Sequence, residues 1–242
     1  MSSKIEEIAP GCFRLGVPFL LNGVIPLGNH MNFIKLQSGR FIALSTVALD
    51  ESTLKQVNEL THNGTLLDAV IATNPFHTLA FTQFHKAFPH AQYYGTPRHI
   101  RNLPAIPWTG SVADESVRKL WSPEIEMRIP DGCEFDAPVP ENLNHFAGII
   151  ALHVASKTLI SDDAFNVTVH PSFFKSLFGA KHGHGIDQRP EAPKEFYVWM
   201  EALLRDWDFD NMATAHSGVL IGGAKNGGQL SKDAVARGGV AF

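Results

Sequence analysis

The stretch of sequence that decides the fold reads Gly148-Ile-Ile-Ala-Leu-His-Val-Ala-Ser-Lys-Thr-Leu-Ile-Ser-Asp-Asp163. Its two apolar runs, residues 148–153 and 158–161, flank a short connection at 155–157, which is typical of a β-hairpin. The second run ends on a pair of aspartates. Because strand ends on a rigid sheet are where α/β-type proteins place ligands and catalysts, the stretch predicts a sheet with a polar site at its edge.

Two histidines repeat this placement elsewhere in the chain. His77 follows the apolar run 66–72, and His216 follows the short strand expected at 211–214. Imidazole and carboxylate groups are suitable ligands for Zn²⁺, Fe or Mn. The wide separation of His77, Asp163 and His216 along the chain predicts a site assembled from two halves of the fold.

Working outward, apolar periodicity and turn residues predict the other elements. In the first half we expect a hairpin at 33–44, a helix at 51–62 after the N-cap Asp50, a strand at 66–72, a helix at 80–88 and a strand at 92–95. Prolines make 104–140 a region of loops around a helix near 114–120 and a strand near 125–129. Further helices are expected at 171–178, 193–206 and 231–237. We predict one domain spanning residues 1–242, with two β-rich halves.

Composition excludes several classes of protein. The 242 residues are 44% apolar and 18% charged, which is ordinary for a globular protein. With 20 basic and 24 acidic residues the net charge is −4, so no nucleic-acid partner is expected. The cysteines, Cys12 and Cys133, form no CxxC pair. The N-terminus lacks the apolar core of a signal peptide, and the longest apolar stretch, 146–154, is too short to cross a bilayer. A cytoplasmic protein without a membrane partner is therefore expected.

The order of these elements and motifs resembles the metallo-β-lactamase fold over about residues 5–228. The most specific matches are Ser156-Lys-Thr-Leu-Ile-Ser-Asp-Asp163 and Trp207-Asp-Phe-Asp-Asn211 followed by Ala215-His216. The resemblance implies an α+β fold, a four-layer αββα sandwich with metal bound at one edge. In this family the metal activates a water that attacks an ester, amide, thioester or phosphoester.

The resemblance carries over unevenly to individual residues. Asn144-His145-Phe-Ala-Gly148 is similar to the family's Pro-Gly-His-Thr-x-Gly loop, which makes His145 a candidate ligand. Asp163 falls where the family has its metal-bridging carboxylate, and His216 falls on the family's last histidine. The first motif departs from the family pattern Thr-His-x-His-x-Asp-His, because this chain has Thr73-Asn-Pro-Phe-His-Thr-Leu79. The family's usual strand-end aspartate is replaced by Ser45-Thr46.

A two-metal site is therefore not expected. We predict one divalent metal, zinc or alternatively iron or manganese, held by His77, His145, Asp163 and His216, since a catalytic zinc needs three protein ligands and an open position. Catalytic roles are predicted for His77, Asp163 and Asp162, the last as a possible general base. The expected function is a one-metal hydrolase or lyase-like enzyme acting on a small organic substrate.

The eroded motif leaves a second reading open. The chain would then be a metal-free pseudoenzyme or ligand-binding protein that keeps the fold, or would use its histidines for metal-independent acid–base catalysis. Metal would be absent in either case.

The remaining histidines, out of 12 in all, are assigned other places. His182 and His184 are expected in a surface loop or a substrate-facing flap. His30 is placed facing the same cleft as the candidate ligands. His153 is expected to be buried and bonded to a backbone carbonyl. Solvated helix faces are expected to carry His62, His85, His90 and His99.

Overall fold

The computed structural model describes residues 3–21, 25–26, 28–136, 147–163, 165, 189–216 and 218–225. Over these residues the strands form a seven-stranded sheet, a five-stranded sheet and a two-stranded ribbon. In sheet order, the seven strands are β1 (Ile5–Ala9), β2 (Cys12–Val17), β5 (Asn29–Lys35), β6 (Phe41–Leu44), β7 (Leu67–Ile71), β8 (Gln92–Gly95) and β9 (Trp108–Ser111). The five are β10 (Ile125–Arg128), β11 (Ile150–His153), β12 (Thr158–Ser161), β13 (Asn211–Thr214) and β14 (Val219–Leu220). The ribbon pairs β3 (Leu20–Leu21) with β4 (Ile25–Pro26).

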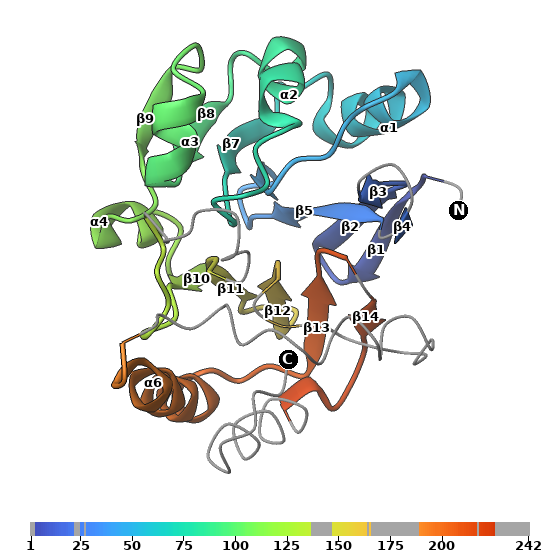
Figure 1. The fold of residues 1–242 in the computed structure, drawn as a ribbon. Helices are drawn as coiled ribbons and strands as arrows, with labels where there is room; N and C mark the ends of the chain where they lie inside the picture. Colours follow the sequence, from blue (N-terminus) through green and yellow to red (C-terminus); the bar gives the residue numbers. More distant parts are fainter. Residues whose placement is uncertain are drawn as a thin grey trace.

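Helices cover the outer face of each of the two large sheets (Figure 1). The described helices are α1 (Glu51–Thr61), α2 (Phe81–Ala87), α3 (Pro97–Asn102), α4 (Glu115–Arg118) and α6 (Ala192–Asp206). None of them is long and apolar enough to cross a membrane.

Three buried apolar clusters separate four layers of structure. One cluster joins Val57 of α1 and Phe81 of α2 to the seven-stranded sheet. A second fills the space between the sheets and includes Ile34 and Ile160. A third packs the inner face of α6, including Met200, against the five-stranded sheet. The order helix, sheet, sheet, helix confirms the predicted α+β class and the αββα sandwich.

Several local predictions are confirmed, because the residues carry their own signals. The hairpin of β5 and β6 pairs antiparallel, as does the hairpin of β11 and β12 within residues 148–163. Helix α1 begins at a capping box, in which the Asp50 side chain accepts from the Thr53 amide and the Thr53 hydroxyl accepts from the Asp50 amide. The helix ends at His62 in the left-handed conformation.

Other elements differ from the prediction. The sequence did not indicate α3 or β9, since α3 is too short to show a helical period and β9 pairs only with β8 at the sheet edge. The helices predicted at 171–178 and 231–237 lie outside the described residues. His99 was expected on a solvated face, but it is fully buried against Phe81. His153 is buried as predicted, but Nδ1 pairs with the Ser156 hydroxyl at 2.7 Å and not with a carbonyl.

The strands next to the sequence motifs run parallel, which gathers their carboxyl ends at one edge. Strands β6, β7 and β8 are parallel neighbours in one sheet, and β12 is parallel to β13 in the other. At this edge the two sheets are joined through the backbone, because the Ile149 amide donates to the Thr73 carbonyl at 2.6 Å. Gly148 makes the close approach possible, since a Cβ on it would lie 3.0 Å from that carbonyl oxygen.

Replacing Gly148 by alanine should therefore destabilise the joint between the sheets. We expect Gly148→Ala to lower the free energy of unfolding by about 1–3 kcal/mol, the usual cost of overpacking. Thermal unfolding followed by circular dichroism measures the effect, with a fall in Tm of about 2–4 °C for each kcal/mol. An unchanged Tm would show that the two sheets move apart slightly at this point and accommodate the added methyl group without strain.

Candidate metal centre

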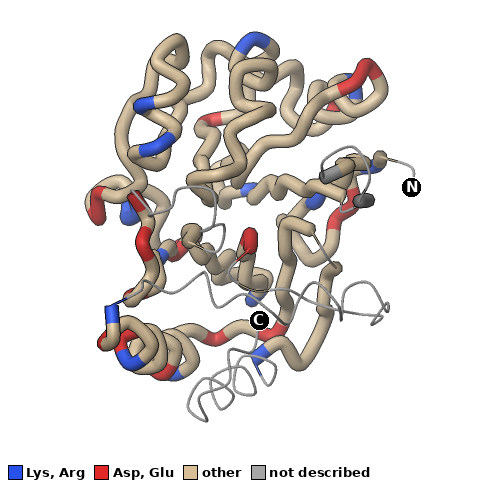
Figure 2. The backbone as a smooth tube through the Cα atoms, viewed as in Figure 1, with Lys and Arg blue, Asp and Glu red and all other residues tan. Residues whose placement is uncertain are grey.

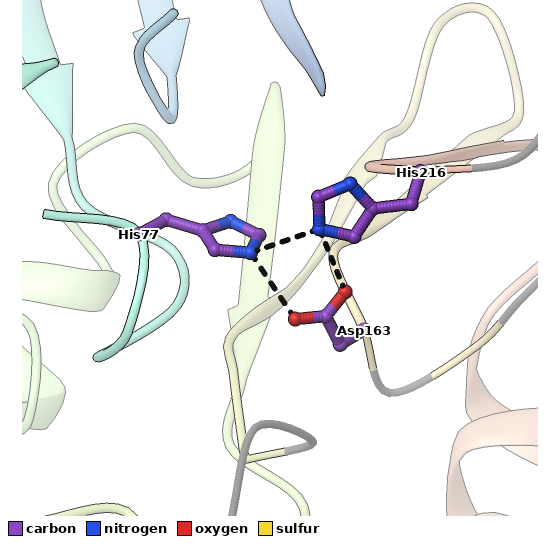
Figure 3. Close-up of side chains that lie close together, drawn as sticks. All are labelled: His77, Asp163 and His216. Atoms are coloured by element: carbon purple, nitrogen blue, oxygen red, sulfur yellow. Dashed lines mark hydrogen bonds and ion pairs between the residues drawn. The ribbon is translucent and has the colours of Figure 1, made fainter. Parts of the chain in front are cut away.

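Three side chains from the two sheets converge at the edge where the parallel strands end (Figure 3). His77 comes from the loop after β7, Asp163 from the turn after β12, and His216 from the segment after β13. Nε2 of His77 lies 3.1 Å from Oδ2 of Asp163 and 3.2 Å from Nε2 of His216. Nε2 of His216 lies 3.3 Å from Oδ1 of Asp163. We call these residues the His–Asp–His triad.

The spacing of these atoms suits a single metal ion. Ligand atoms placed about 2.0–2.1 Å from a tetrahedral zinc ion lie about 3.3–3.4 Å from one another, close to the distances in the triad. Two imidazoles and a carboxylate supply the three protein ligands of a catalytic zinc site and leave a fourth position open. The same distances permit hydrogen bonds within the triad, so its geometry fits a metal without requiring one.

The two aspartates are held by Thr73 and Asn74, which follow β7. The Thr73 hydroxyl donates to Oδ2 of Asp162, and the Asn74 amide donates to Oδ2 of Asp163 at 2.8 Å. Consecutive residues after β7 thus bind consecutive aspartates after β12. Asp162 and Asp163 are 5% and 8% exposed, so these hydrogen bonds satisfy carboxylates that water barely reaches.

His216 is oriented by the segment that enters β5. Its Nδ1 lies 2.8 Å from the Gly28 carbonyl, which can only accept a hydrogen bond. Nδ1 therefore carries a proton, and Nε2 faces Asp163 and His77. Nδ1 of His30 in turn donates to the carbonyl of Ala215, the neighbour of His216. His30 thus lies beside the candidate site, as the sequence analysis expected.

Asp162 and His99 lie next to His77. Its Nδ1 lies 3.8 Å from Oδ2 of Asp162, and its backbone carbonyl accepts from Nε2 of His99 at 3.3 Å. Burial alone lowers the pKa of His77, but the charge and hydrogen bond of Asp163, together with the charge of Asp162, raise it to about 9. Burial raises the pKa of Asp162, while the His77 charge and the Thr73 hydrogen bond oppose that shift.

The structure brings together three of the four candidate metal ligands that the sequence predicted. It brings together His77, Asp163 and His216, with Asp162 directly behind His77. His145, the fourth candidate ligand, lies outside the described residues, as do His182 and His184.

Sequence reasoning missed three contributors to this edge. Asn74 counted only as a missing histidine and Thr73 was given no role, although their position directly after a strand was a signal. Arg14 was overlooked in the apolar run of β2, where its side chain is 6% exposed and Nη2 donates to the Thr214 carbonyl. A charged residue at an inward-facing strand position was the available signal.

Charged side chains are otherwise distributed over the described surface. Figure 2 shows Lys and Arg interspersed with Asp and Glu along the chain. Several form exposed pairs, such as Arg128 with Asp206 at 3.1 Å and Lys157 with Asp208 at 2.6 Å. Such surface pairs contribute little to stability.

Solved metallo-β-lactamases have the same arrangement of sheets and helices. FIM-1 from Pseudomonas aeruginosa, in its mono-zinc form, matches with a TM-score of 0.66 at 9% identity, over 98% of this chain and 96% of that chain. A metallo-β-lactamase from Erythrobacter litoralis matches with a TM-score of 0.64 at 12% identity, over 96% of each chain. DIM-1 matches with a TM-score of 0.66 at 14% identity, over 97% of each chain. No family model and no curated protein matches the sequence.

The chain therefore has the metallo-β-lactamase fold, which confirms the resemblance found in the sequence. At identities this low the likeness shows the fold alone. The function of the site at the edge of the sandwich depends on the residues that this chain places there.

The buried imidazole of His99 makes the stability of this region sensitive to acid. Burial, aided by the charges of His77 and Arg98, lowers the pKa of His99 to about 4, although its bond to the His77 carbonyl opposes the shift. Between about pH 6.5 and 4 the unfolded chain binds a proton that the folded chain does not. Stability should fall with falling pH over this window, by up to about 3 kcal/mol from this residue.

Urea unfolding of the wild type and His99→Gln between pH 7.5 and 4.5 tests this expectation. The variant lacks the titrating group, so its free energy of unfolding should fall less steeply with acid. Parallel curves for the two proteins would mean that His99 is protonated in the folded state.

Proposed function

We propose that this protein is a hydrolase that uses one divalent metal ion, held by His77, Asp163 and His216, to act on a small organic substrate. The observation that carries the proposal is the convergence of their three ligand atoms at the edge where the parallel strands of both sheets end. Zinc is the first choice, with iron or manganese as alternatives, because the donors are imidazole and carboxylate. The mono-zinc form of FIM-1 gives a precedent for one metal on this fold.

The bound metal would polarise the substrate and lower the pKa of a water molecule. The residues of the chain would prepare the site for it. His216 is fixed by Gly28 in the tautomer that presents Nε2 to the metal. Asp163 directs Oδ1 toward Nε2 of His216, at 3.3 Å, while Oδ2 accepts the Asn74 amide.

Asp162 supports His77 in this scheme. Its Oδ2 lies toward Nδ1 of His77 and accepts the Thr73 hydroxyl, and the side chain is buried. A carboxylate behind a metal-binding histidine fixes the ring and increases the basicity of the ligating nitrogen. We therefore propose a positioning role for Asp162 and retain proton transfer from water as the alternative.

The metal-free alternative has one observation in its favour. A protonated His77 would balance carboxylate charge without any metal, because its pKa is raised to about 9 by Asp163 and Asp162, against the effect of burial. A binding protein, or an acid–base catalyst that uses the two histidines, would have this property. A small-molecule partner is common to both proposals, and one solved structure of this fold, DIM-1, is of protein exposed to a small molecule, ceftazidime.

Metal analysis of protein purified without an affinity tag decides between these proposals. We expect about one metal ion per chain, lost in an Asp163→Ala, His216→Ala double variant because only one of the three ligands is left. His90→Ala, at an exposed position, is the matched control and should keep its metal. A wild type that holds no metal even after incubation with zinc, iron or manganese would favour the metal-free alternative.

The role of Asp162 is tested separately. Asp162→Asn keeps the shape of the side chain and removes its charge. We expect this variant to bind the same number of metal ions with an affinity about 10–100-fold lower, the usual effect of losing a carboxylate behind a ligating histidine. Competition with a chelator measures the affinity. An unchanged affinity combined with loss of hydrolysis would instead support Asp162 as the general base.

A further inference from the structure

The segment that carries His216 is held by residues 28–30, where β5 begins. The Gly28 carbonyl accepts from Nδ1 of the His216 ring at 2.8 Å. Nδ1 of His30 donates to the carbonyl of Ala215, the residue before His216. These contacts join residues that are 188 and 185 positions apart in the chain. One short segment thus binds both the side chain and the backbone at a residue of the His–Asp–His triad.

The contact made by His30 joins the two large sheets. Strand β5 belongs to the seven-stranded sheet, and β13, which leads into His216, belongs to the five-stranded sheet. The preceding carbonyl, that of Thr214, accepts from Nη2 of Arg14 on β2, the strand beside β5. Side chains from two neighbouring strands therefore bind two consecutive carbonyls at the end of β13. Each carbonyl can only accept a hydrogen bond, so the side chains are the donors.

His30 can lie here because the residue opposite it is a glycine. Gly16 on β2 pairs with His30 on β5. A Cβ at position 16 would lie 2.8 Å from Cδ2 and 2.9 Å from Nε2 of the His30 ring. Carbon atoms in contact are about 3.5–4.0 Å apart, so a side chain at position 16 would displace the ring. Gly16 does not have a positive φ, and we therefore attribute the glycine to the space that the imidazole needs.

The His30 ring is an uncharged donor. Burial, aided by the charges of Arg14 and His216, lowers the pKa of His30 to about 4, although the bond to Ala215 opposes the shift. A neutral imidazole has one N–H group, and the Ala215 carbonyl requires that group at Nδ1. His30 thus contributes a hydrogen bond of fixed direction to this edge and no charge near pH 7.

The position of Nε2 in His216 depends on the ring and on the backbone that carries it. Gly28 binds the ring, and Phe19 stacks on it with the ring centroids 6.4 Å apart. His30 binds the backbone one residue earlier. Nε2 faces Asp163 and His77 (Figure 3). A ligand set of this kind has to be held within about 0.5 Å of its working geometry, which requires support around each ligand.

We propose that His30 is a positioning residue for His216, and that Gly16 provides the space for this role. The His30 bond to Ala215 fixes the backbone, the Gly28 bond fixes the ring, and Nε2 is thereby directed at the other two members of the triad. That His216 binds a metal rests on the proposed function, whereas its dependence on His30 does not.

Two variants of His30 test the hydrogen bond itself. His30→Leu removes the donor, and His30→Asn keeps an N–H on the atom bonded to Cγ, in the place of Nδ1. Chelator competition gives the zinc affinity, and the visible spectrum of cobalt-loaded protein reports the ligand geometry. We expect His30→Leu to alter this spectrum and to lower the zinc affinity about tenfold, the low end of the effect of losing a partner around a ligand. His30→Asn should keep both properties.

Gly16→Ala tests the space for the ring. With His30 present, the added methyl group should displace the imidazole and have the same effect as His30→Leu. An asparagine at position 30 lacks Cδ2 and Nε2, the atoms that the methyl group would meet. The double variant Gly16→Ala, His30→Asn should therefore bind metal as His30→Asn does. Such coupling between the two positions would not arise from a general loss of stability.

His153→Leu is the matched control for losing a buried histidine. Its side chain is 3% exposed, and Nδ1 pairs with the Ser156 hydroxyl at 2.7 Å. His153 stands opposite Thr158, at the end of β12 away from Asp163. This variant should lower Tm but leave the cobalt spectrum and the zinc affinity unchanged.

Nuclear magnetic resonance of the metal-free protein tests the same role without a metal. The Nδ1 proton of His216 is bonded to the Gly28 carbonyl, so its exchange with water reports how firmly the ring is held. We expect this exchange to be about tenfold faster in His30→Leu than in the wild type or His30→Asn, the effect of losing one hydrogen bond.

Two results would overturn the proposal. One is a His30→Leu variant that matches the wild type in proton exchange and in metal binding. The other is an equal loss in His30→Leu and His30→Asn, since packing of the ring and not its hydrogen bond would then hold the segment. A wild type that binds no metal would contradict the proposed hydrolase, and the proton exchange would then decide by itself whether His30 positions His216.

Discussion

The edge of this sandwich depends on a double connection between two strand ends. Thr73 and Asn74, after β7, donate to Asp162 and Asp163, after β12. The backbone bond from Ile149 to Thr73 lies beside them. Hydrogen bonds to charged groups are among the stronger ones in proteins, and here both carboxylates are buried. Because each bond joins one sheet to the other, the contacts that satisfy the aspartates also fix the distance between the elements that carry His77 and His216. The same two residues hold the site in shape although residues 73–79 differ from the Thr-His-x-His-x-Asp-His pattern.

Burying two carboxylates also dictates the chemistry around them. An ionised carboxylate in a protein interior needs a cation or strong donors nearby. Among the described residues, the groups that can carry positive charge at this edge include Arg14 and a protonated His77, and a metal could take the place of the His77 proton. Both proposed functions meet this requirement. They differ in the cation that balances the carboxylate charge, which is a metal ion in the hydrolase and a protonated His77 in the metal-free alternative. The same requirement applies to the buried Arg14 guanidinium. Its charge acts on Asp162, but among the described residues Arg14 forms no ion pair and its Nη1 has no hydrogen-bond partner.

Much of the fold could be predicted because its signals are local. The β11–β12 hairpin follows from two apolar runs around a short connection, and α1 follows from its cap at Asp50. Elements without such a signal were missed, as α3 and β9 illustrate. The histidines likewise divide into those whose position was predicted correctly and those whose surroundings were not. Residue type and position after a strand selected His77 and His216, whereas the polar surroundings of His99 in the sequence gave the wrong environment. Burial depends on which distant residues, such as Phe81, pack against a side chain.

The sequence by itself determined the class of fold, the strands that end at the edge, and three residues whose chemistry suits a metal. The class of fold follows from the resemblance in the order of elements and motifs, and the other features depend on periodicity, turn residues and residue type, which are properties of short stretches. The tertiary structure alone decided that Thr73 and Asn74 hold the aspartates, that Gly28 sets the tautomer of His216, and that Arg14 lies buried beside Asp162. Each of these contacts joins residues far apart in the chain. No local pattern encodes them, because they arise only when the two sheets pack and bring their strand ends within hydrogen-bonding distance.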